Sequence, residues 1–291
     1  MPKTRFKKFL KIFYQAGYQT VHDDGIEHAG YLAFLGMLSI FPSLIFFFAL
    51  AAGLGRADFG GEFISEIYRV LPKNIGEALS PRIDEILNGP PQGLITIAII
   101  GIVWSASSAV EGLRTILNRI YHVKNPPRYI FRRLRSILQF IVFIFIITVA
   151  MFFLTIAPAI TEYAETTLKM NLHLTTGGEI VRYIISSIVL LIVISASYYI
   201  LPNIEQSFVR AMPGAFIVVI LWLSLVKLFA IYVTYYPQIS VVYGSLAGII
   251  LTLIFFYVLS IIYIYGAEFN YFLEKYLGHE IEEKEQVKAT K

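Results

Sequence analysis

The fold is decided by the 57 residues from Ala211 to Ala267, which read AMPGAFIVVILWLSLVKLFAIYVTYYPQISVVYGSLAGIILTLIFFYVLSIIYIYGA and carry one charge, Lys227. At about 1.5 Å per residue, a single helix of this length would extend about 85 Å, far more than the ~30 Å of hydrocarbon in a bilayer. The segment must therefore fold back on itself. Pro237 places the break, because proline removes a backbone donor and disfavours helix for the residue before it. Two membrane-spanning helices are predicted, at residues 211–234 and 241–267.

Four further runs without a charged residue precede this segment, and each has at least 22 residues. About 20 apolar residues suffice for a helix to cross a bilayer, so each run predicts a spanning helix. These helices are expected at residues 29–55, 94–113, 136–160 and 183–201. The sequence therefore predicts an all-α, polytopic membrane protein with six transmembrane helices, which form a single membrane domain over residues 1–291.

The overall composition agrees with this assignment. The chain has 291 residues, of which 57% are hydrophobic and 15% charged. Soluble domains contain about 45–50% apolar and about 25% charged residues, so a water-soluble globular protein is excluded. Cysteine is absent. Disulfides, thiolate metal sites and a cysteine nucleophile are therefore excluded as well.

The distribution of basic residues predicts the topology. The chain has 24 Lys and Arg against 20 Asp and Glu, a net charge of +4. With six spans both chain ends lie on one side, which carries 17 of the basic residues, whereas the other side carries 6. The positive-inside rule makes the richer side cytoplasmic. Cations that flank helices can bind anionic lipid at about 1 kcal/mol each, so we expect membrane lipids as partners and no nucleic acid.

The two chain ends outside the predicted spans differ in composition from the spans, and the first contains an amphipathic pattern. Residues 1–28 are predicted to be a basic cytoplasmic leader and residues 268–291 a cytoplasmic tail. Within the leader, apolar residues share one face of an amphipathic helix, which predicts that this helix lies in the membrane interface. The residues of this face are Phe6, Phe9, Leu10 and Phe13.

The outer loop at residues 56–93 is the longest segment between spans. Apolar residues at helical spacing, followed by the helix-start signal Ser80-Pro81, predict that it is helical. The loop could form a lid over a cavity, or its apolar face could rest on the membrane surface. Both interpretations stay open.

Motifs of catalysis are missing from the sequence. None of the five histidines belongs to an H-E-x-x-H motif, and no G-x-S-x-G, Walker A or Rossmann pattern occurs. The cluster His22-Asp-Asp-Gly-Ile-Glu-His28 could hold a divalent ion through carboxylate and imidazole groups. We prefer a solvated turn broken at Gly25, because no further ligands are spaced to complete a coordination shell. We therefore expect no enzyme, no catalytic residue, no metal and no cofactor.

Three ionisable residues fall within or at the edge of the predicted spans, at a cost of at least ~2.5 kcal/mol each. Glu111 and Glu268 are expected near the cytoplasmic edge, where Glu111 can pair with Arg114 and Glu268 can be a membrane-edge carboxylate. Lys227 is expected about 20 Å away, too far for a direct ion pair with either acid. Its side chain could snorkel outward, line a cavity that attracts an anionic headgroup or solute, or meet an outer acid. Such acids are Glu162, Glu165, Asp58 and Glu62.

Prolines and small residues indicate how the helices meet. Pro42 in the first helix and Pro213-Gly214 in the fifth are candidate kinks, and a kink is compatible with a cavity. Gly101, Ser105 and Ala109 repeat every four positions on the second helix, which is typical of a close-packing face. Because such a face can pack within one chain or between chains, a homo-oligomer stays open.

Several stretches in order along the chain resemble the YihY/BrkB family of bacterial inner-membrane proteins, formerly labelled ribonuclease BN. They are AGYLAFLGMLSIFP at 29–42, WSASSAVEGL at 104–113, NRIY at 118–121, LPN at 201–203, RAMPG at 210–214, VYG at 242–244 and YGAEFN at 265–270. The resemblance implies six helices and location in a bacterial inner membrane. Members have been associated with envelope integrity and lipid handling, so it favours movement of an amphiphile over catalysis. Glu268 and Asn270 match the family's Gly-Ala-Glu-x-Asn pattern, and Glu111 lies in its Trp-Ser segment.

These observations give three hypotheses of function. The first is a non-catalytic transporter or flippase-like protein for a lipid-like or anionic solute of unknown identity. The second is a structural or assembly protein of the cell envelope, and the third is a hydrolase or nuclease at residues 22–28. The candidate cavity or gating residues are Lys227, Glu111, Glu268, Asn270 and Pro42.

Overall fold

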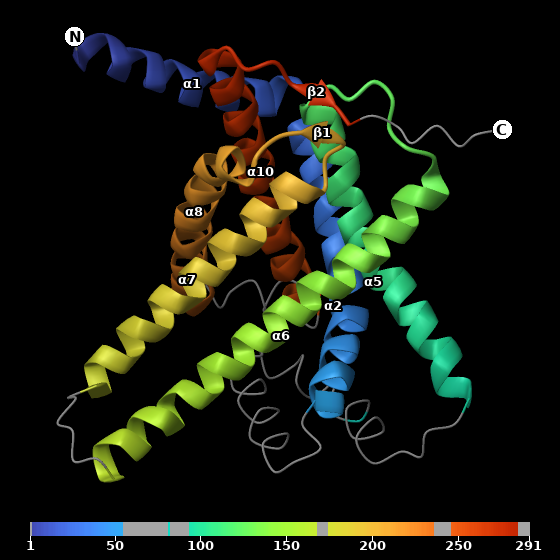
Figure 1. The fold of residues 1–291 in the computed structure, drawn as a ribbon, viewed down its shortest axis with the longest axis vertical. Helices are drawn as coiled ribbons and strands as arrows, with labels where there is room; N and C mark the ends of the chain where they lie inside the picture. Colours follow the sequence, from blue (N-terminus) through green and yellow to red (C-terminus); the bar gives the residue numbers. More distant parts are fainter. Residues whose placement is uncertain (1, 55–80, 82–92, 168–173, 236–245, 285–291) are drawn as a thin grey trace. The chain divides into compact units, whose positions relative to one another are not determined.

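The computed structural model describes residues 2–54, 81, 93–167, 174–235 and 246–284. These residues are almost entirely helical (Figure 1). The helices are α1 (Pro2–His22), α2 (Gly25–Leu54), α5 (Gly93–Ile120), α6 (Tyr129–Thr167), α7 (Leu174–Ile200), α8 (Phe208–Tyr235) and α10 (Ala247–Leu277). Two short strands complete the described structure, β1 (Ile204–Glu205) and β2 (Glu282–Glu283).

The helical prediction is confirmed, and three segments are long and apolar enough to cross a membrane. They are Tyr183–Ile200 in α7, Phe208–Val233 in α8 and Ala247–Leu277 in α10, which correspond to the last three predicted spans. The first three predicted spans lie in α2, α5 and α6. The total of six spans stays a prediction, and the outer loop at 56–93 lies almost wholly outside the described residues.

Several helices are longer than the apolar runs that predicted them. Helix α6 covers Tyr129–Thr167 instead of 136–160, and α5 continues from 113 to Ile120. The additional turns contain arginine and glutamate, which are good helix formers even where they interrupt an apolar run. Hydropathy therefore locates the apolar part of each helix and underestimates its length.

The chain divides into two compact units, and every contact described below lies within one of them. The first comprises residues 1–37, 108–135 and 191–291, and the second comprises residues 38–107 and 136–190. In the second unit the Ser39 hydroxyl donates to the Ser105 carbonyl at 3.4 Å. A side chain at Gly101 would meet no atom within 4 Å. Pro42 lies inside α2, which continues to Leu54.

In the first unit, α1 packs on α10 (Figure 1). The Phe13 ring lies 4.8 Å from that of Phe269, and Ile12 and Ala16 are buried with it. Leu10, which was expected on the same face as Phe13, is 60% exposed. Helix α1 is therefore confirmed as a helix, its position in the membrane interface stays a prediction, and the side chains of Phe6 and Phe9 lie outside the described residues.

Helices α8 and α10 approach most closely at two glycines. A Cβ atom on Gly214 would lie 2.1 Å from the Gly266 carbonyl oxygen, and one on Gly266 would lie 2.3 Å from Val218 Cγ2. Glycine allows this approach because it has no side chain. The sequence marks Gly214 only as part of a candidate kink, whereas the structure makes it a helix-crossing point.

The C-terminal segment joins two loops of the first unit. Helix α10 ends at Leu277, before Gly278 with a positive φ of 76°, and β2 then pairs antiparallel with β1. The Glu283 carboxylate accepts hydrogen bonds from the backbone N–H groups of Lys124 and Asn125, at 2.7 and 3.2 Å. Strands of two residues have no detectable alternation, so residues 268–291 are predicted only as a tail.

Candidate functional site

The first unit contains an ionic network where α5 meets the start of α6. The Glu111 carboxylate lies 3.3 Å from Nε of Arg114, which is the expected pair within α5. Its other oxygen lies 3.3 Å from Nε of Arg132 on α6. Arg114 also donates from Nη1 to the Leu201 carbonyl at 3.0 Å. The network therefore connects α5, α6 and the loop before β1.

Asn118 fixes the same loop one turn further along α5. Its side-chain oxygen accepts a hydrogen bond of 2.7 Å from the backbone N–H of Asn203. The backbone N–H of Lys284 donates to the Asn203 carbonyl at 3.2 Å. The Leu201-Pro-Asn203 stretch is thus held by α5 on one side and by the C-terminal segment on the other.

Several basic side chains lie close to one another beside the loop at 201–203. Burial lowers the pKa of Arg114, and the positive charges of Arg135 and Arg132 oppose the effect of Glu111. Burial also lowers the pKa of Lys284, and the charges of Arg135 and Arg114 lower it further, against Glu205. We call Arg114, Arg132, Arg135 and Lys284 the basic cluster. Among the charges that act on Arg114 and Lys284, the cations outnumber the two acids, Glu111 and Glu205, which favours binding of an anion.

Asn270 joins α10 to α8 at the proline. Its side-chain oxygen accepts a hydrogen bond of 2.7 Å from the N–H of Gly214, and its amide nitrogen donates to the Ala211 carbonyl at 3.0 Å. A proline inside a helix disturbs the local hydrogen-bond ladder, and Pro213 lies between these two groups. Asn270 therefore bonds backbone groups on either side of Pro213 in α8.

Two more acids on α10 are buried. Glu274 pairs with Arg210 Nη1 at 3.3 Å and with His279 Nδ1 at 2.9 Å. Glu268 is 3% exposed and forms no ion pair or hydrogen bond among the described residues. These two carboxyl groups lie six residues apart in sequence but in different electrostatic surroundings.

Tyrosine hydroxyls connect α7 to α10. The Tyr198 hydroxyl donates to the Tyr263 carbonyl at 2.5 Å, and the Tyr263 hydroxyl lies 2.8 Å from Oγ of Ser197. The two rings are 4.8 Å apart. Sequence reasoning missed these contacts because the tyrosines and the serine occur inside apolar runs, where nothing distinguishes them from their neighbours.

The residues of the His22–His28 cluster separate into different contacts. Asp24 forms an ion pair of 2.8 Å with Arg119, Asp23 accepts a hydrogen bond from Gln19, and the His22 ring stacks on Tyr18. In the part of the chain that the structure describes, no group of three or more His, Cys, Asp or Glu side chains could hold a metal ion.

His28 gives the cluster a pH-dependent effect on stability. Burial lowers the pKa of the His28 imidazole, and the positive charge of Arg119 lowers it further. The unfolded chain then binds a proton more readily than the folded protein, so stability is lost as the pH falls through about 6.5. We expect His28→Gln to reduce the loss of Tm between about pH 8 and about pH 5. Equal losses in both proteins, measured by thermal unfolding, would contradict this.

Neither Lys227 nor Pro42 takes part in the contacts described above. The Lys227 side chain is exposed on α8, and it forms no ion pair within the described residues. The side chains of the outer acids proposed as its partners lie outside the described residues. Pro42 belongs to the second unit, whereas Glu111, Lys227, Glu268 and Asn270 belong to the first. The structure therefore places four of the five candidate residues in one compact unit, although Lys227 takes no part in its polar contacts among the described residues.

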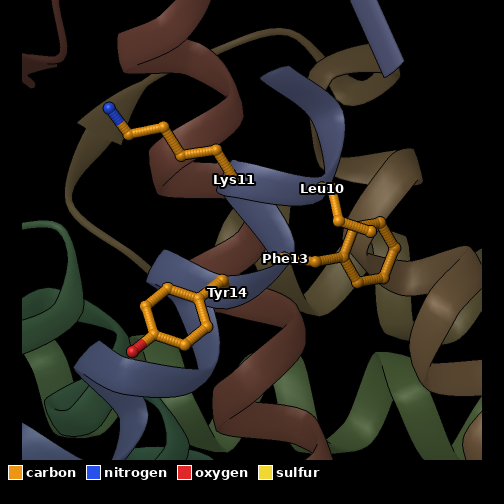
Figure 2. A pocket seen from close by; sticks show the side chains of 4 residues that line it. All are labelled: Leu10, Lys11, Phe13 and Tyr14. Carbon is orange, nitrogen blue, oxygen red and sulfur yellow. The ribbon is translucent and has the colours of Figure 1, made fainter. Parts of the chain in front are cut away.

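A hollow of about 580 Å³ opens on the surface of α1 (Figure 2). Its lining residues are Leu10, Lys11, Phe13 and Tyr14. In Figure 2, Leu10 and Phe13 lie together on one side of the helix, and Lys11 and Tyr14 point to the other. The hollow thus combines apolar rings and chains with one cation.

Comparisons with known proteins agree with the membrane assignment. The family model described as "Virulence factor BrkB" matches residues 17–290. A protein of Bacillus subtilis named "Putative ribonuclease-like protein YfkH" is 33% identical over 88% of this chain and 92% of its own length. A "UPF0761 membrane protein" of Pseudoalteromonas atlantica is 26% identical over 89% of this chain and 85% of its own. No solved structure matches the chain significantly.

Proposed function

We propose that this chain, which belongs to the BrkB family of membrane proteins, is a non-catalytic transporter or flippase-like protein for a lipid-like or anionic solute. We place it in a bacterial inner membrane with both chain ends in the cytoplasm. The basic cluster is the observation that carries the proposal. It gathers four cations beside the loop at 201–203, next to helices apolar enough to span a membrane.

The chemistry of the basic cluster suits a phosphate or carboxylate group. Arginine presents several N–H donors in a planar fork that matches such anions in a bidentate geometry. Arg114 is largely committed to Glu111 and Leu201. Arg135 and Lys284 are the cluster members that we expect to contact the anion first, because Arg135 is exposed and Lys284 is half-buried.

The hollow on α1 supports an amphiphilic solute. Tyr14 is 73% exposed beside Lys11, so a lipid could place its chain against the apolar wall and its headgroup near the ammonium group. An amphipathic helix with exposed aromatic residues and lysines binds an anionic membrane surface in the same way. Membrane lipids are therefore the partners that this surface fits.

The double variant Arg135→Gln, Lys284→Gln tests whether the basic cluster binds an anion. At about 1 kcal/mol for each cation, we expect it to bind anionic phospholipid roughly 30-fold more weakly than the wild type. Native mass spectrometry of purified protein titrated with phosphatidylglycerol and with phosphatidylcholine measures the difference. Arg128→Gln is the control, because Arg128 is an exposed arginine in the loop between α5 and α6 and lies outside the basic cluster. Equal weakening by the control and the double variant would contradict the assignment.

Transport itself requires a flux measurement. We expect liposomes with the wild-type protein to move fluorescent phospholipid between leaflets faster than protein-free liposomes, and the double variant to slow this movement. Movement of neither lipid nor small anions above the protein-free background would remove the transport proposal.

A structural or assembly protein of the envelope is the second candidate. It is favoured by the exposed Lys227, since a snorkelling lysine requires no internal cavity. The absence of flux, together with specific retention of an envelope protein, would support this candidate. The hydrolase hypothesis at residues 22–28 is tested separately by nuclease assay of the purified protein, with His22→Ala as the comparison.

A further inference from the structure

We propose that Glu268 is a proton-binding site that the folded protein keeps as a neutral carboxylic acid. Three glutamates of the first unit are buried: Glu111, Glu268 and Glu274. The first and third have cationic partners within 3.3 Å. Glu268 has none among the described residues, although it is 3% exposed. The inference goes beyond transport and does not depend on it.

The geometry places Glu268 between the turn at 23–24 and the end of α5. A Cβ atom on Gly25 would lie 3.3 Å from Cγ2 of Ile264, so this turn packs on α10 about one helical turn before Glu268. On the other side, the Tyr271 ring lies 6.2 Å from that of Tyr121 and 5.1 Å from that of His122. Glu268 therefore belongs to the face of α10 that meets both segments.

Among the residues that the structure describes, the charged group that acts on Glu268 is an acid and not a cation. The carboxyl group of Asp23 acts on it electrostatically, and Tyr271 is its aromatic neighbour on α10. Burial raises the pKa of the Tyr121 hydroxyl at the end of α5, and acidic neighbours that include Glu268 raise it further.

Cations on the elements packed against α10 are engaged elsewhere. Arg210 of α8 pairs with Glu274, and Arg119 of α5 pairs with Asp24. Lys11 of α1 lines the surface hollow. The tyrosines of α7 and α10, Tyr198 and Tyr263, bond to backbone and serine groups. Within the described part of the chain, Glu268 is therefore left without a counter-ion.

An unpaired carboxylate in such surroundings is costly, and the group reduces this cost by binding a proton. One carboxylate oxygen takes the proton from water and forms an O–H bond, and the acid becomes neutral. Release of this proton would place a second negative charge near Asp23. We therefore expect deprotonation of Glu268 to weaken the contact between the turn at 23–24 and α10. The strength of this contact would then depend on pH.

The first test compares thermal unfolding of the wild type and Glu268→Gln across pH. In the unfolded chain Glu268 ionises near its ordinary pKa, whereas in the folded protein it keeps its proton. The wild type therefore loses stability relative to the variant as the pH rises, and the difference in Tm, variant minus wild type, grows from acid to neutral pH. Glu111→Gln and Glu274→Gln are matched controls that should lower Tm at neutral pH, because each leaves an arginine without its carboxylate.

The second test needs no change at Glu268. Dicyclohexylcarbodiimide reacts with a protonated carboxyl group: the acid O–H adds across one C=N bond, and the adduct rearranges to an N-acylurea that keeps the whole reagent. We expect Glu268 to be labelled at neutral pH, with a rate that falls about tenfold per pH unit once the group ionises. Asp23→Asn, which removes the neighbouring charge, should move this fall to lower pH.

Mass spectrometry of the labelled peptides measures both effects. Parallel Tm curves for the wild type and Glu268→Gln would overturn the proposal. A labelling profile that Asp23→Asn leaves unchanged would also overturn it, and this result is available even if Glu268→Gln does not fold.

Discussion

Gly214→Ala is expected to destabilise the protein by about 3 kcal/mol or more, although the change adds a single methyl group. The new Cβ atom would lie 2.1 Å from the Gly266 carbonyl oxygen and 2.7 Å from Cγ of Asn270. The first of these contacts is with backbone, so α8 and α10 would have to separate along their length. Thermal unfolding of the purified protein measures the effect as a large fall in Tm or as the loss of folded material.

Gly101→Ala is the matched control for this prediction. The same methyl group at Gly101 would meet no atom within 4 Å. Alanine is the better helix former by about 1 kcal/mol, so the control should leave Tm unchanged or raise it. Similar changes in Tm for the two variants would contradict the close approach of α8 to α10.

Asn270→Leu is expected to cost about 2–5 kcal/mol. Leucine has a similar size but cannot bond to the N–H of Gly214 or the carbonyl of Ala211, and each buried backbone group left unsatisfied costs about 1–3 kcal/mol. A fall in Tm and in the recovery of folded protein would measure this loss.

Pro213→Ala distinguishes the proposed role of Asn270 from simple packing. Alanine restores the backbone N–H donor that Pro213 lacks, which allows α8 to satisfy more of its own groups. We expect Asn270→Leu to cost less in the Pro213→Ala background than alone, and a double-mutant cycle measures the difference. Purely additive effects would show that Asn270 acts independently of the proline.

The sequence predicts the helices well because hydropathy is a local property. Charge-free runs such as 211–267 require only that neighbouring residues be apolar, and α8 and α10 occur within this stretch. The pair of Glu111 with Arg114 is predictable for the same reason, since i and i+3 are neighbours on one helix.

Most of the candidate site depends on contacts between distant residues, and these could not be predicted. Arg132 reaches Glu111 from another helix, and Asn270 binds groups 56 and 59 residues earlier in the chain. The free-energy cost of placing an ionisable side chain in a membrane identifies Glu268 as unusual from the sequence. Only the structure shows that, among the described residues, Glu268 has no cationic partner, whereas Glu274 pairs with Arg210. The basic cluster was missed because Arg114, Arg135 and Lys284 read as ordinary flanking charges.

The pairing of β1 with β2 also imposes an order on assembly during synthesis. The loops at 121–128 and 201–207 leave the ribosome well before residues 282–284, which bind both of them. Arg114 and Asn118 can bind Leu201 and Asn203 before that point, but the connection of the two loops through Glu283 and Lys284 forms only with the last part of the chain. A chain released before residue 282 would therefore have every described helix complete and would lack this connection.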